Sequence, residues 1–277
     1  MGQSKALSSK AQEVIHKYFN LPFTDVPGVR CPYFNNARKR KRGELRVLVG
    51  KGSPSEIVEE AKIISLQYHA GIFDHLGNCC LSCSTHNHGE KENEETVQQC
   101  IRKFLIDNDL GIECSGFVTQ VLRAHYLQTR GVDIVKKIQT VSARNFFRFL
   151  IAKLRPLENI SVKVLADKCN SVALSDWKSA QAGDLIVVLE IKAAKPYNHI
   201  LLVTENDGEK IKYVHARAWS SEGKYGHGVA EGVIKITSPE KGLLEQVWEE
   251  LGKIGVENET WKDAKSAQKV EVRRLMV

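Results

Sequence analysis

The sequence predicts an α+β fold in which helices come first and an antiparallel sheet follows. Apolar residues at helical spacing, with capping residues at the helix ends, recur up to residue 154, and short apolar runs rich in β-branched residues begin at residue 183. This order is typical of α+β proteins. The chain has 277 residues and a hydrophobic content of 42%, which is enough for a large core. We predict a helical N-terminal extension over residues 1–93 and a second domain over residues 94–277.

Three helices are predicted before residue 110. Residues 5–19 carry apolar side chains at helical spacing. Ser53-Pro54-Ser55-Glu56 supplies an N-cap serine, a proline at the first helical position and a glutamate three residues after the cap, so a second helix is expected to begin here. Residues 94–106 form the third helix, which leads the chain to Cys114.

A run of five cations, Arg38-Lys39-Arg40-Lys41-Arg42, lies between the first two predicted helices. The whole chain has 40 basic and 33 acidic residues, and its formal net charge is +7. Such a run forms a solvated loop or contacts a polyanion, such as nucleic acid, an acidic cell-wall polymer or a membrane surface. No aromatic residues alternate with these cations, so the pattern does not indicate nucleic-acid recognition.

The chain has seven cysteines and no apolar segment typical of a signal peptide or a membrane span. An odd number of cysteines in such a chain predicts free thiols and a cytoplasmic location. Cys80, Cys83, His86 and His88 are spaced closely enough to be candidate zinc ligands. Structural zinc sites usually take a second pair of ligands from a separate loop, so a polar or redox-sensitive loop without metal is the main expectation here. No cofactor is predicted.

Cys114 is the strongest candidate for a nucleophile. Apolar residues from Phe117 onward follow a helical stripe that ends at Gly131, a typical C-terminal capping residue, so Cys114 is expected on the first turn of a helix. The backbone N–H groups there have no helical partner, and the positive end of the helix dipole favours a thiolate over a thiol. The same N–H groups, above all that of Cys114, can bind an oxyanion.

The predicted sheet places two histidines close together. After a helix over residues 142–154, three short apolar runs bounded by turn formers predict strands over residues 183–189, 198–203 and 212–216. His199 starts the second strand and His215 ends the third. A tight turn between antiparallel strands brings these positions together, so His215 can hold the imidazole of His199.

The last part of the chain predicts a strand over residues 229–237, a helix over residues 239–251 and a terminal strand over residues 270–275. These elements complete the α+β pattern. The two strands extend the predicted sheet, and none of the three elements contains a candidate site residue.

Several of these motifs, taken in order, resemble the NlpC-type papain-like cysteine peptidases, a family similar to bacterial cell-wall peptidases. The motifs are Cys114-Ser115-Gly116-Phe117-Val118, Gly183-Asp184-Leu185, the strand led by His199, and Val214-His215-Ala216, and the resemblance covers residues 94–237. It implies a papain-like fold in which the helix with the nucleophilic cysteine packs against the sheet with the histidine. It also implies that Cys114 attacks an amide carbonyl, His199 is the base and His215 orients His199.

Glu113 stands where the family usually has aspartate. In some members the Asp-Cys-Ser segment binds the free amino group of a peptide substrate, and the resemblance gives this substrate-binding role to Glu113 and Ser115. The expected function is a cysteine peptidase or amidase that cleaves an amide in a peptide or peptidoglycan fragment through a thioester. The same chemistry serves an acyltransferase, and a papain-like scaffold without turnover would instead bind an anion or a partner.

Overall fold

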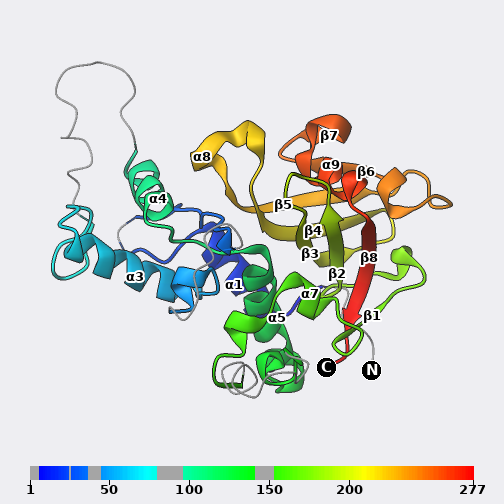
Figure 1. The fold of residues 1–277 in the computed structure, drawn as a ribbon, viewed down its shortest axis with the longest axis horizontal. Helices are drawn as coiled ribbons and strands as arrows, with labels where there is room; N and C mark the ends of the chain where they lie inside the picture. Colours follow the sequence, from blue (N-terminus) through cyan, green and yellow to red (C-terminus); the bar gives the residue numbers. More distant parts are fainter. Residues whose placement is uncertain (1–5, 25, 37–44, 80–95, 141–152) are drawn as a thin grey trace.

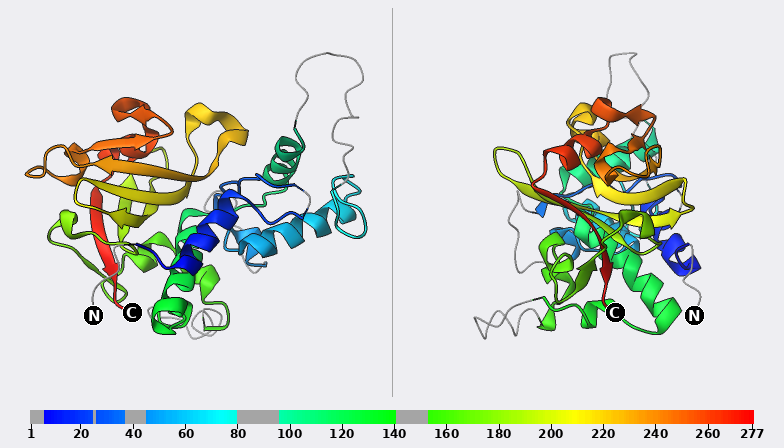
Figure 2. Two further views of the ribbon diagram at one scale, coloured as in Figure 1. Left: turned by 180° about the vertical axis from the view of Figure 1, so that it is seen from behind. Right: turned by 90° about the vertical axis from the view of Figure 1, so that its right-hand side faces the viewer.

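The computed structural model describes residues 6–24, 26–36, 45–79, 96–140 and 153–277. These residues form an α+β fold with one antiparallel sheet of eight strands, so the α+β part of the predicted fold class is confirmed. Figure 1 and Figure 2 show the helices of the first half of the chain on one side of the molecule and the sheet on the other. Among the described residues, no helix is both long and apolar enough to cross a membrane.

The first three of the described α-helices begin at residues whose side chains cap them. The α-helices are α1 (Ser9–Phe19), α3 (Pro54–Gln67), α4 (Val97–Asp107), α5 (Cys114–Arg130), α7 (Val162–Leu165), α8 (Gly223–Gly226) and α9 (Glu259–Ser266). The predicted capping box at the start of α3 is confirmed, because Ser53 accepts from the N–H of Glu56 and the Glu56 side chain accepts from the N–H of Ser53. α1 and α4 start a few residues later than predicted, at the caps Ser8 and Thr96.

The sheet positions the histidines on neighbouring strands. The strands are β1 (Ser171–Ala173), β2 (Leu185–Ile191), β3 (Tyr197–Asn206), β4 (Lys210–Arg217), β5 (Gly228–Lys235), β6 (Val247–Glu250), β7 (Lys253–Ile254) and β8 (Lys269–Leu275). Their order in the sheet is β1-β8-β2-β3-β4-β5-β6-β7. The three central strands, β2, β3 and β4, are the three that the apolar runs predicted, and each pairs with the next.

Both faces of the central strands are buried, so their side chains alternate between two hydrophobic clusters. On β3, Ile200 and Leu202 belong to the cluster shared with α5, whereas Leu201 and Val203 belong to a second cluster that includes Ala264 of α9. The views in Figure 2 agree with this arrangement, in which the sheet lies between α5 and α9. Strands covered on both faces form nearly continuous apolar runs in the sequence, as β2 and the middle of β3 do.

The segment predicted as an N-terminal extension shares the core of α5. α1 lies against α5, and the rings of Tyr18 and Phe117 meet edge to face with 5.2 Å between their centroids. Both side chains are fully buried, and the Tyr18 hydroxyl donates to the carbonyl of Gly52. The N-terminal segment therefore supports the helix that carries Cys114.

The prediction of a helix over residues 239–251 is wrong. This stretch contains a short 3-10 turn at Leu243–Glu245 and then strand β6, whose residues alternate between half-buried and buried. Trp248 and Glu250 are the buried pair, and Trp248 lies opposite Ile234 of β5. Tertiary pairing with β5 overrides the helical propensity of the glutamates and leucines here. The helix in this region is α9 instead, with Asn258 as its N-cap.

Some predictions concern residues outside those that the structure describes. They are the helix over most of residues 142–154, the cationic run Arg38-Lys39-Arg40-Lys41-Arg42, and the candidate zinc ligands Cys80, Cys83, His86 and His88. Within the described ranges, no cluster of histidine, cysteine and carboxylate side chains has the geometry of a metal site.

Candidate active site

Cys114 is the first residue of α5, on the first turn as predicted, and Gly131 ends this helix with the positive φ of 66° expected of a glycine cap. The start of α5 is held against residues 50–52. The N–H of Glu113 donates to the carbonyl of Gly50, with 3.0 Å between nitrogen and oxygen. A side chain at Gly116 would place its Cβ 2.3 Å from that carbonyl oxygen, so only glycine allows this approach. Backbone packing therefore fixes the turn that carries the thiol.

The Cys114 thiol lies beside the start of β3. Its side chain is almost buried, with 6% of the residue surface exposed. The backbone N–H groups of Ser115 and Ile200 lie near the sulfur and act to lower the pKa of the thiol. Since Ile200 directly follows His199, the thiol is next to the backbone that carries the predicted base. Within the described residues, no hydrogen bond joins the thiol to the His199 imidazole itself, which is common in unliganded sites.

The prediction that Cys114 is a thiolate is wrong, because the surroundings of the residue favour the neutral thiol. Burial, and to a smaller extent the nearby Glu113 carboxylate, raise the pKa of the thiol to about 12. Lys51 and the two N–H groups act in the opposite direction but do not offset burial. The helix dipole alone predicted the opposite sign, because the sequence did not show how completely the sheet covers this turn. The resting residue is a neutral thiol.

His199 and His215 meet as the hairpin geometry predicts. Nε2 of His199 and Nδ1 of His215 are 2.7 Å apart, and both residues are buried. Burial holds the pKa of His199 well below its usual value, and the neighbouring His215 lowers it further. At neutral pH, His199 is therefore an uncharged imidazole. Its Nδ1 forms no hydrogen bond with any described residue and is available to a substrate or to the thiol.

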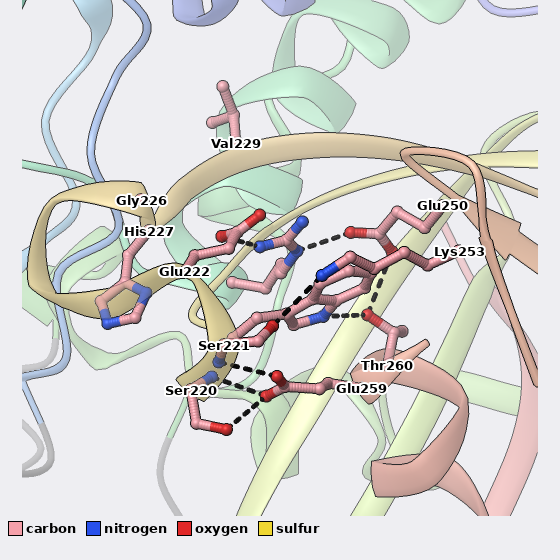
Figure 3. A network of polar contacts seen from close by, with 12 residues as sticks. Ser220, Ser221, Glu222, Gly226, His227, Val229, Glu250, Lys253, Glu259 and Thr260 are labelled. Atoms are coloured by element: carbon pink, nitrogen blue, oxygen red, sulfur yellow. Dashed lines mark hydrogen bonds and ion pairs between the residues drawn. The ribbon is translucent and has the colours of Figure 1, made fainter. Parts of the chain in front are cut away.

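Beyond His215 the chain of contacts continues to a buried carboxylate that the sequence did not predict. Glu250 Oε2 accepts from Nε2 of His215 over 3.1 Å, and Oε1 accepts from Nε of Arg217 over 2.5 Å. Arg217 also forms an ion pair with Glu222, so Figure 3 shows Glu222 and Glu250 approaching one guanidinium from two sides. Thr260, on α9, donates to Glu250. This network links the histidines to the loop after β4.

A buried lysine lies on the other side of Cys114. Lys51 Nζ donates to Ser115 Oγ over 2.7 Å and to the carbonyl of Ile160, and it forms an ion pair with Glu113. Ser115 in turn donates to Glu113. The lysine side chain is only 3% exposed. The two residues predicted to bind a substrate amine are therefore already bound to an amine of the protein, and their substrate-binding role stays a prediction.

Two of these unpredicted residues had a usable signal in the sequence. Arg217 is two residues after His215, and Glu250 is two residues after Trp248, so each shares a strand face with a residue that is buried. If β6 had been recognised as a strand, Glu250 would have been predicted to be buried on the same face as Trp248. Lys51 had no such signal, because its burial depends on the approach of α5 and the segment at Ile160.

Lys51 is expected to keep the Cys114 thiol reactive by neutralising Glu113. In Lys51→Met, the unpaired Glu113 carboxylate would raise the pKa of the thiol, and alkylation by iodoacetamide at a fixed pH would slow about tenfold for each pH unit of that rise. The measurement is mass spectrometry of the peptide that contains Cys114, over a series of pH values. Glu113→Gln in the same chain should restore the rate. Lys224→Met, which removes an exposed ion pair with Asp107, is the control.

If Lys51→Met alkylates as fast as the unchanged protein, or if the double variant stays slow, the ammonium does not act on the thiol through Glu113. A change that appears only as lower stability would then indicate a packing role.

No model of a known protein family matches this chain, and no curated protein or solved structure does so.

Proposed function

We propose that the protein is a cysteine hydrolase that cleaves an amide bond, in a peptide or a peptidoglycan fragment, through a thioester on Cys114. The observation that carries the proposal is the placement of the thiol. Cys114 starts a helix and lies near the backbone N–H of Ile200, the residue after His199 on β3, and Nε2 of His199 is held by His215. A nucleophile, a base and a residue that orients the base are the three parts that acyl transfer needs.

The reaction begins from neutral partners. His199 takes the thiol proton as the Cys114 sulfur bonds to the carbonyl carbon, so the ion pair forms only during the attack. The oxyanion lies near the backbone N–H of Cys114, which has no helical acceptor. The C–N bond then breaks, His199 gives its proton to the leaving amine, and a thioester remains. Water, activated by His199, hydrolyses the thioester and restores the thiol.

The ordered motifs that resemble NlpC-type peptidases support a peptide or cell-wall fragment as the substrate. An acyltransferase would use the same residues up to the thioester and would differ only in the acceptor. Contact with a polyanion through residues 38–42 remains a prediction from the sequence. The chemistry of the first step is common to both reactions, so it is the step to test.

Exposure of the full chain to a library of peptides and peptidoglycan fragments is expected to give an acyl adduct on Cys114. Mass spectrometry of the intact protein and its peptides would detect the adduct, and its mass would identify the acyl group. Cys114→Ala should form none, whereas Cys169→Ala, which changes an exposed thiol, should behave like the unchanged protein. His199→Ala should acylate about 10²- to 10⁴-fold more slowly, because it removes the base.

The neutral, buried thiol also favours a second candidate, a papain-like scaffold that binds a partner without turnover. In that case no fragment would acylate Cys114, and Cys114→Ala would bind the same ligands as the unchanged protein. The same library therefore separates the two candidates.

A further inference from the structure

We propose that Glu250 is a positioning residue that fixes the protons of both histidines, so that His199 keeps Nδ1 unprotonated. Glu250 does not touch the thiol, and it would act through His215. The catalytic use of the His199 nitrogen rests on the proposed function. The positions of the protons follow from the contacts of two neutral rings with an ionised carboxylate.

Glu250 has only donors around it. The residue is 1% exposed, and Oε2 accepts from the hydroxyl groups of Tyr213, over 3.2 Å, and Thr260, over 3.0 Å, as well as from His215. The Thr260 hydroxyl accepts from the indole N–H of Trp219 over 3.0 Å, which directs its own proton to Glu250. Figure 3 shows Thr260 beside Glu250 in this network.

The carboxylate is ionised and can only accept. Burial alone would raise the pKa of Glu250, but His215 and Arg217 lower it to about 2. A carboxylate has no proton to give, so the hydrogen bond with His215 requires a proton on Nε2 of His215. If Nε2 of His215 carried no proton, its lone pair would face a lone pair of Glu250 Oε2 at 3.1 Å inside the protein, and both groups would be left without a hydrogen bond.

The proton on His215 then determines the proton on His199. When the pH is high enough for both rings to be neutral, a proton on Nε2 of His215 leaves a lone pair on its Nδ1, and this nitrogen faces Nε2 of His199 at 2.7 Å. Nε2 of His199 must donate, so the lone pair of His199 is on Nδ1. One buried carboxylate thus sets the tautomers of two successive rings, and the free nitrogen of His199 is the one able to accept a proton.

Arg217 makes Glu250→Gln a sharp test. At the position of Oε1 the guanidinium can only donate, whereas the Tyr213 and Thr260 hydroxyls at the position of Oε2 can turn and accept from an amide N–H, so the amide oxygen of the new side chain takes the position of Oε1. The amide nitrogen then faces His215 and donates to its Nε2. This reverses both rings, moving the proton of His215 to Nδ1 and that of His199 to Nδ1. In Arg217→Met with Glu250→Gln, the amide is free to turn its oxygen to His215 and restore the original tautomers.

The tautomers can be measured without any substrate. In the protein labelled with ¹⁵N-histidine, NMR spectra distinguish the protonated from the unprotonated nitrogen of each ring, and His199→Gln and His215→Gln assign the signals. We expect protons on Nε2 of both rings in the unchanged protein, and on Nδ1 of both rings in Glu250→Gln. The double variant should return them to Nε2. Glu249→Gln, the neighbouring half-buried carboxylate paired with Lys235, is the matched control and should change nothing.

Acylation of Cys114 should follow the tautomers. Glu250→Gln is expected to slow acylation by about 10²- to 10⁴-fold, because a histidine base held in the wrong tautomer slows a Ser-His-Asp triad by a similar factor. The double variant should acylate at least about tenfold faster than Glu250→Gln. A purely structural role would not be rescued by a second substitution at Arg217.

A proton on Nδ1 of His199 in the unchanged protein, or unchanged tautomers in a folded Glu250→Gln, would overturn the inference. If Glu250→Gln does not fold, the spectrum of the unchanged protein still decides. If the tautomers agree with the prediction while no fragment acylates Cys114, the inference stands and the proposed function fails.

Discussion

Arg217→Met is expected to lower the free energy of unfolding by about 3–5 kcal/mol, because it leaves a buried carboxylate without its cation. The side chains of Arg217 and Glu250 are 4% and 0% exposed, and the ion pair between them is 2.5 Å long. The guanidinium also lies 3.9 Å from the centroid of the Trp219 ring. Methionine keeps much of the apolar length that covers the indole, so the loss would come mainly from the charge.

Urea denaturation at neutral pH measures this loss as a lower midpoint with an unchanged slope. Adding Glu250→Gln to Arg217→Met removes the unpaired charge and should recover most of the stability. Lys224→Met, at an exposed ion pair, should leave the midpoint nearly unchanged. If Arg217→Met is as stable as the unchanged protein, Glu250 does not depend on this cation.

Stability is expected to fall in two steps as the pH is lowered. The pKa of His199 is far below its usual 6.5 in the folded protein, so below about pH 6.5 the unfolded chain binds a proton that the folded protein excludes. Glu250 has a pKa of about 2 when folded and 4.5 as its ordinary value. The contribution of Glu250 to the free energy of unfolding is complete above pH 4.5 and is lost between pH 4.5 and 2. This second step amounts to about 3 kcal/mol.

Urea midpoints measured across pH 7.5 to 3 would show these steps. His199→Gln should make the step that begins near pH 6.5 smaller, leaving the part due to His125, whose burial also lowers its pKa. Glu250→Gln should make the lower step smaller, leaving the part due to Glu259, whose pKa is also lowered to about 2. A midpoint that stays constant between pH 7.5 and 5, or that falls equally in His199→Gln, would contradict the assignment of the first step to His199.

Local signals in the sequence predicted the elements that carry the candidate site. The capping box at Ser53, the glycine after α5 and the apolar runs of β2, β3 and β4 each depend on residues close in sequence. The meeting of His199 and His215 followed from one hairpin, which is also a local arrangement. For these features, propensity and tertiary structure agree.

The predictions that were wrong or missing concern properties that depend on segments far apart in the sequence. The stretch from residue 239 to 251 has helix-forming residues but pairs with β5, and this pairing decides its structure and the burial of Glu250. The thiol of Cys114 has a raised pKa because α5 is covered by the sheet, which no pattern near the cysteine indicates. Lys51 is buried through contacts with Ser115 and Ile160, 64 and 109 residues away.

The wide spacing of these contacts has a consequence for synthesis on the ribosome. Cys114 leaves the ribosome long before the strands of the sheet, so a nascent chain exposes the thiol that β3 and β4 help to bury in the finished fold. Domains form as units during translation, and contacts that close long loops form late. The arrangement around the thiol is thus absent from incomplete chains and arises only when nearly the whole sheet has assembled.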